Sequence, residues 1–172
     1  MKNDSDASAQ SLLLHEHKKI SGLFKEYGQA SDPKSKEDVV QNLSMELHIH
    51  MMLEEQVLFP ALEKEGRGKK LLAEAQNENN EIKCVLDQLQ RMMADQDNKE
   101  YDKKVGELEK CVDRHISQSE KKLLLKAENA GLDMEELAND ICKKKDNLTG
   151  TAAVTSQEAL EPRHCYQPEH QR

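Results

Sequence analysis

The chain has 172 residues and a net charge of −8, and 34% of its residues are charged. This length suits one domain with a substantial core, and the acidic balance argues against binding to nucleic-acid phosphates or anionic membranes. No apolar run approaches the roughly 20 residues that span a bilayer, and the first residues lack the hydrophobic region of a signal peptide. We therefore predict a cytoplasmic protein without membrane or nucleic-acid partners.

Scarce aromatic residues, with few Gly or Pro before the tail, favour amphipathic helices over a sheet. After a polar lead over residues 1–9, a first helix is predicted from apolar residues that alternate at spacings of four and three. Its inward line is Leu13, His17, Ile20, Phe24 and Tyr27. The turn and breaker residues from Gly28 to Pro33 end this helix.

A second helix is predicted over residues 34–65, with a local kink at Pro60. Its inward line is Val39, Leu43, Leu47, His50, Glu54, Val57 and Ala61. Side chains at i and i+4 share a face, so His50 and Glu54 occupy core positions. Burying a carboxylate without a partner is costly, and a metal cation makes such burial tolerable. We interpret His50 and Glu54 as metal ligands.

The third and fourth helices each carry polar residues on their inward lines. The third line is Leu72, Ala75, Asn79, Ile82, Leu86, Leu89 and Met93. The fourth line is Tyr101, Val105, Leu108, Val112, His115 and Ser119. A fifth helix, capped by Asp133, is predicted to end near Lys145.

These patterns predict an all-α fold: an up-down-up-down four-helix bundle over residues 10–145, with a short fifth C-terminal helix. The composition of residues 146–172 predicts a disordered tail, because the segment has too little apolar surface to offset its chain entropy. A weak internal repeat relates residues 50–64 to residues 115–129, since both segments begin with an inward-facing histidine.

Antiparallel packing would place four polar inward residues at comparable depth, with His17 opposite His50 and Asn79 opposite His115. A single inward histidine is usually a core residue hydrogen-bonded to its surroundings. Three histidines on three helices, one paired with a glutamate at i+4, favour a metal site instead. Imidazole and carboxylate together suit iron, zinc or manganese. The sequence contains no phosphate-binding loop, nucleophile elbow or serine triad.

The motifs resemble those of the hemerythrin-like, or HHE cation-binding, family. The resemblance rests on Leu14-His-Glu-His17-Lys-Lys-Ile20 through Phe24, on His50-Met-Met-Leu-Glu54-Glu-Gln-Val-Leu-Phe-Pro60-Ala-Leu, on Glu78-Asn-Asn-Glu-Ile82-Lys and on His115-Ile-Ser-Gln-Ser-Glu120. It implies a non-heme di-iron centre that binds oxygen or serves in iron and oxidant sensing and handling. The implied ligands are His17, His50, Glu54 as a bridging carboxylate, His115 and Glu120.

Two positions depart from the family pattern. Asn79 stands where the family places a histidine, with Glu78 adjacent, and Ser119 stands four residues after His115. In a regular helix Glu120 is rotated about 140° from His115, so it reaches a metal only through a widened turn or a bent side chain. Three outcomes stay open: a di-iron site with an unusual ligand, a mononuclear site, or a bundle that has lost stable metal binding.

Three functional hypotheses follow from these outcomes. We favour a non-enzymatic iron protein whose partners are the metal and dioxygen, or another small diatomic or peroxide ligand. The first alternative is a di-iron or mono-iron oxidoreductase that acts on peroxide or nitric oxide, because a missing imidazole would leave an open coordination position. The second is a metal-free helical interaction bundle. The sequence does not specify an oligomeric state.

Overall fold

The structure, a computed structural model, describes residues 8–66, 68–94 and 98–154. These residues form helices joined by short turns, and no strand is present among them. In chain order the elements are α1 Ala9–Gln29, α2 Pro33–Leu53, η1 Glu54–Leu58, α3 Phe59–Lys64, α4 Lys69–Leu89, α5 Asn98–Gln118, η2 Ser119–Leu123, α6 Leu124–Asn129 and α7 Met134–Val154. The elements η1 and η2 are single π-helical turns.

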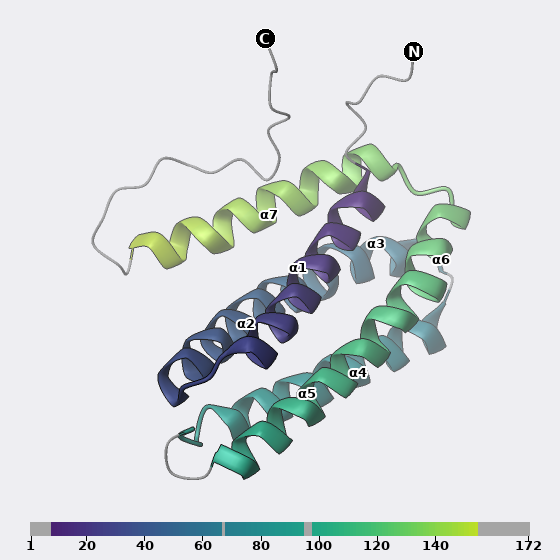
Figure 1. Ribbon diagram of the computed structural model, residues 1–172. Coiled ribbons are helices and arrows are strands. Elements are labelled where there is room, and N and C mark those ends of the chain that lie inside the picture. The colour runs from purple at the N-terminus through teal and green to yellow at the C-terminus, as the bar shows by residue number, and fades with distance from the viewer. Residues whose placement is uncertain (1–7, 67, 95–97, 155–172) are drawn as a thin grey trace, which may run out of the picture.

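Two antiparallel helix pairs, α1 with α2 and α4 with α5, build the bundle (Figure 1). Both helices of the first pair begin with a capping residue. Ser8 Oγ accepts a hydrogen bond from the backbone N–H of Ser11, and Asp32 Oδ1 accepts one from that of Ser35 at 2.9 Å. Pro33 occupies the first turn of α2, where no backbone donor is needed. The predicted all-α four-helix bundle is confirmed.

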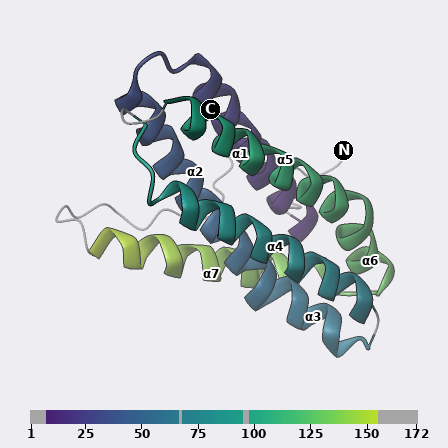
Figure 2. The ribbon, with the colours of Figure 1, turned by 90° about the horizontal axis from the view of Figure 1, so that it is seen from below.

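The fifth helix, α7, lies across α1 and α2 on the side away from α4 and α5 (Figures 1 and 2). It continues to Val154 and is therefore longer than the short helix ending near Lys145 that the sequence predicted. Contacts with the bundle stabilise the additional turns of α7: Leu148 packs against the core and Lys145 pairs with buried Glu16. Of the predicted disordered tail, residues 146–154 are helical, and residues 155–172 lie outside the described residues.

The π turns interrupt the two long helices directly after the inward histidines. Each π turn accommodates one extra residue, so the buried line shifts by one position beyond it. Leu58 and Leu62 are buried, whereas the predicted inward residues Val57 and Ala61 are only partly buried. The irregularity expected at Pro60 is thus a widened turn that begins at Glu54. The predicted repeat is visible in the backbone, since η2 and α6 match η1 and α3 in length and order.

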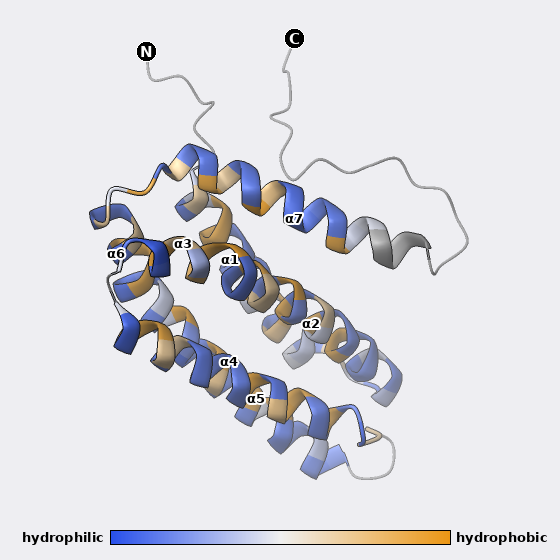
Figure 3. Ribbon diagram, turned by 180° about the vertical axis from the view of Figure 1, so that it is seen from behind, coloured by the Kyte–Doolittle hydropathy of each residue, from blue (hydrophilic) through white to orange (hydrophobic). Residues whose placement is uncertain are grey.

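The apolar core is divided into two clusters with a polar layer between them. One cluster includes Leu13, Leu58 and Leu123, and the other includes Ile20 and Val112. Hydrophobic and hydrophilic segments alternate along the bundle helices, as amphipathic helices require (Figure 3). None of the helices in the described part of the chain is long and apolar enough to cross a membrane.

Candidate metal centre

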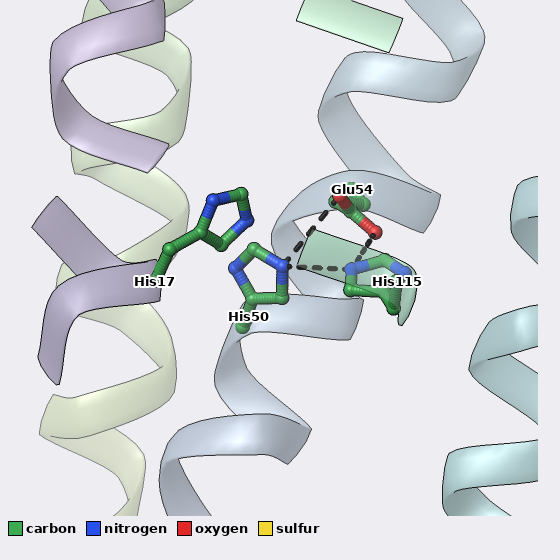
Figure 4. Close-up of side chains that lie close together, drawn as sticks. All are labelled: His17, His50, Glu54 and His115. Atoms are coloured by element: carbon green, nitrogen blue, oxygen red, sulfur yellow. Dashed lines mark hydrogen bonds and ion pairs between the residues drawn. The ribbon is translucent and has the colours of Figure 1, made fainter. Parts of the chain in front are cut away.

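Four side chains from three long helices converge in the polar layer (Figure 4). His17 comes from α1, His50 from the end of α2, Glu54 from the start of η1 and His115 from the end of α5. Each is at most 1% exposed. One ligand atom from each residue lies within 4.8 Å of the corresponding atoms of the other three. The structure thus brings together four of the five residues that the sequence predicted as ligands.

Glu54 is the anionic member of this cluster. Its Oε1 lies 3.5 Å from His50 Nε2, and its Oε2 lies 3.4 Å from His115 Nε2. The Nε2 atoms of His50 and His115 are 3.2 Å apart, so the two rings face one another beside the carboxylate. Two imidazole nitrogens and a carboxylate that converge in this way form a donor set suited to a cation.

His17 completes the cluster from the side of α1. Its ring lies edge-on to that of His50, with the centroids 4.8 Å apart, as the predicted antiparallel pairing requires. Among the described residues, its buried Nε2 has no hydrogen-bond partner. Its Nδ1 contacts Glu120 Oε1 at 3.0 Å. With the Nδ1 proton donated to Glu120, Nε2 presents a lone pair to the cluster.

Glu120 and Glu78 therefore lie on the outer side of the histidines. The Glu120 side chain is 40% exposed and contacts the nitrogen of His17 that points away from the other ligands. Glu78 Oε2 lies 3.6 Å from His115 Nδ1, the nitrogen opposite the one facing Glu54. Carboxylates in this outer position orient imidazole ligands and raise their basicity. The family resemblance implied Glu120 as a ligand and the sequence placed Glu78 next to Asn79, but spacing alone did not distinguish an inner from an outer contact.

Asn79 and Ser119 are buried in the same layer and contact Glu54. Asn79 Nδ2 donates to Glu54 Oε2 at 3.4 Å, and Ser119 Oγ donates to Glu54 Oε1 at 3.2 Å. The contact of Ser119 with Glu54 was missed at the level of sequence. The spacing in the sequence could have indicated this contact, because Ser119 follows His115 by four residues just as Glu54 follows His50.

The charges of the cluster are strongly coupled. Burial disfavours the anionic form of Glu54, but His115 and His50 outweigh it and hold the pKa of Glu54 well below its ordinary value. Burial also disfavours the charged form of His115, yet the Glu54 charge, with help from Glu78, raises its pKa to about 10. Burial and the neighbouring His50 lower the pKa of His17 to about 4, although the hydrogen bond that His17 donates to Glu120 acts to raise it.

These shifts predict a bell-shaped dependence of stability on pH for the metal-free protein. The contribution of His115 is complete below the unfolded pKa of about 6.5 and is lost as pH rises through about 10. Below about pH 6.5 the unfolded chain protonates His17 while the folded chain resists until about pH 4, so stability falls with falling pH. The contribution of Glu54, whose folded pKa is depressed, is also lost in acid. We therefore expect the free energy of unfolding to be largest at about pH 6.5.

Urea unfolding of chelator-treated protein across this pH range measures the effect. In Glu54→Gln the alkaline decline should flatten, because His115 loses the partner that raises its pKa. A wild-type free energy of unfolding that is constant between about pH 6.5 and about pH 10 would contradict the assignment.

Comparison with known proteins identifies the family of the chain. The family model described as the hemerythrin HHE cation-binding domain matches residues 8–127 of the chain. The chain therefore belongs to the hemerythrin HHE cation-binding family, and the predicted resemblance is confirmed.

Two individual proteins are similar to the chain. The crystal structure of a hemerythrin HHE cation-binding domain-containing protein from Mycobacterium kansasii aligns with a TM-score of 0.76 and 21% identity, over 87% of this chain and 91% of that one. This likeness supports the fold. A protein of Nostoc sp. strain PCC 7120 named DNA nickase is 27% identical over 124 residues, which are 72% of this chain and 34% of that protein. The chain thus spans about a third of the length of that relative.

The residues of the cluster fit the cation that the family binds. Three imidazoles and one carboxylate supply nitrogen and oxygen donors of the kind that divalent metals take. The partnerless Nε2 of His17 points to a missing ligand, since buried polar atoms are normally paired. The polar layer therefore has donor groups that could hold a metal ion, in a chain whose family is described as cation-binding.

Proposed function

We propose that this protein is a non-heme iron protein that binds dioxygen or a similar small ligand and serves in iron or oxidant handling. His17, His50, Glu54 and His115 hold the iron, and Glu120 acts through His17. The observation that carries the proposal is the convergence of three buried histidines and one buried carboxylate within 4.8 Å. Iron chemistry suits this mixed nitrogen and oxygen donor set.

Space for a small ligand supports the same function. A cavity of about 10 Å³ lies beside His115 and Ser119. Such a volume is close to the minimum that holds one water molecule, so it is too small for an organic substrate. Four protein donors also leave positions on an octahedral iron free for an external ligand.

Elemental analysis of protein expressed with iron tests the proposal. We expect wild-type protein to retain iron after desalting and to change its visible absorption when the anaerobic ferrous form meets oxygen. His50→Ala should lose both properties. His48→Ala is the matched control, because His48 is exposed and two residues away. Wild-type protein that stays iron-free after anaerobic loading would refute the proposal.

An oxidoreductase that acts on peroxide or nitric oxide is the second candidate, and the free coordination positions favour it. Turnover separates the two functions. Iron-loaded protein that consumes many equivalents of peroxide or nitric oxide per site is an enzyme, whereas one that reacts once per site is a binding or sensing protein. We expect the single stoichiometric reaction.

A further inference from the structure

The bundle consists of two halves with the same design. In the first half α1 is followed by α2, η1 and α3, and in the second half α4 is followed by α5, η2 and α6. The π turns begin at Glu54 and at Ser119, which are 65 residues apart. The buried lines of the first helices also match in spacing: Leu13, His17, Ile20 and Phe24 in α1, and Ala75, Asn79, Ile82 and Leu86 in α4.

This correspondence pairs the polar residues of the two halves. His17 of the first half matches Asn79 of the second by its place in the buried line. His50 matches His115, and Glu54 matches Ser119, both with the offset of 65 residues. The first half thus contributes two imidazoles and a carboxylate, whereas the second half keeps one imidazole and replaces the other two ligands with neutral side chains.

The two neutral side chains occupy the side of Glu54 that faces the second half. Asn79 donates to one carboxylate oxygen and Ser119 donates to the other. Both residues are at most 3% exposed. Hydrogen bonds from neutral donors satisfy a buried carboxylate without a cation. Neither an amide donor nor a hydroxyl donor replaces the imidazole and carboxylate that an iron ion would need there.

The space beside these residues is small. The cavity of about 10 Å³ in the second half is lined by Ala75, Glu78, His115 and Ser119 among others. Ser119 borders this space with a short side chain that carries no charge. His115 is the remaining inner ligand of that half, and its Nε2 faces His50 and Glu54.

We propose that Asn79 and Ser119 limit this protein to one metal ion per chain. They do so by holding Glu54 with hydrogen bonds at the position where a second metal would otherwise share it. The inference rests on the proposed iron binding by His17, His50, Glu54 and His115 and specifies its stoichiometry. Glu54 is then a terminal ligand, in contrast to the bridging role that the family resemblance implied.

Anaerobic loading with Fe²⁺, followed by desalting and elemental analysis, tests this proposal. Wild-type protein should bind one equivalent, and Asn79→His/Ser119→Glu should bind two. Asn80→Ala/Gln118→Ala is the matched control, since it changes the neighbouring positions on the same two helices outside the polar layer, and it should still bind one. After oxidation, wild-type protein should show the electron paramagnetic resonance signal of an isolated high-spin ferric ion. The Asn79→His/Ser119→Glu variant should lose most of this signal, because two neighbouring ferric ions couple magnetically.

Wild-type protein that binds two equivalents overturns this inference and leaves iron binding intact. Wild-type protein that binds none overturns the proposed function and the inference together. A double His/Glu variant that binds only one equivalent also refutes the inference, provided that its circular dichroism spectrum matches that of the wild type. The number of iron equivalents that wild-type protein binds tests the inference even when that variant does not fold.

Discussion

Replacing Glu54 with glutamine should weaken iron binding by more than about 100-fold, because even the loss of an outer partner of a metal ligand costs about 10–100-fold. Glu54 supplies the carboxylate of the four-residue cluster and is 0% exposed. Glutamine keeps the shape of the side chain and removes its charge. The change in affinity therefore reports the electrostatic contribution to binding, and competition with a chelator of known affinity measures it.

The neighbouring residue provides the control for this experiment. Glu55 lies outside the cluster, where it accepts hydrogen bonds from Lys83 at 2.7 Å, from Gln76 and from Asn79 at 3.3 Å. Glu55→Gln should bind iron as wild-type protein does. Nuclear magnetic resonance titration gives a second readout, since the pKa of His115 should fall from about 10 in metal-free Glu54→Gln. Unchanged affinity in Glu54→Gln would remove Glu54 from the ligand set.

Metal binding should also raise the stability of the fold. A cation that binds the folded chain alone adds about 4 kcal/mol to the free energy of unfolding at about 1,000 times its dissociation constant. For a chain of this size that increment corresponds to a rise in Tm of roughly 8–16 °C. The gain arises because the four donor side chains converge only in the folded chain, so binding of the metal is linked to folding.

Thermal unfolding with Zn²⁺, which has no redox chemistry, measures this increment without oxidation. His50→Ala should show little or no shift at the same concentration, whereas His48→Ala should behave as wild-type protein does. Equal melting temperatures for chelated and metal-loaded wild-type protein would support the metal-free interaction bundle instead.

The inward lines of the helices were predictable because helical periodicity depends on local sequence. Every predicted inward residue from Leu72 to Leu89 and from Tyr101 to Ser119 is buried. The prediction weakened beyond Glu54, where the π turn moved the buried positions from Val57 to Leu58. A widened turn adds one residue without a break in the apolar pattern, so periodicity alone does not reveal it.

The end of α7 depended on tertiary contacts. Residues after Asp146 have the composition of a disordered segment, but Leu148 gains apolar contact with the bundle and the helix continues to Val154. Most of the stability of a helix in a protein comes from packing of its amphipathic face, which sequence composition does not describe. The length of α7 therefore differed from the prediction although its start did not.

The sequence by itself determined the helices, the depth of the polar layer and the kinds of donor atoms in it. These properties follow from residue type and from a period of about 3.5 residues, which is read locally. The tertiary structure decided which atoms meet: Glu54 inside the cluster, Glu120 on the outer nitrogen of His17, and Asn79 and Ser119 on the carboxylate. Those contacts depend on the rotation and spacing of helices distant in the chain, and a local pattern does not specify them.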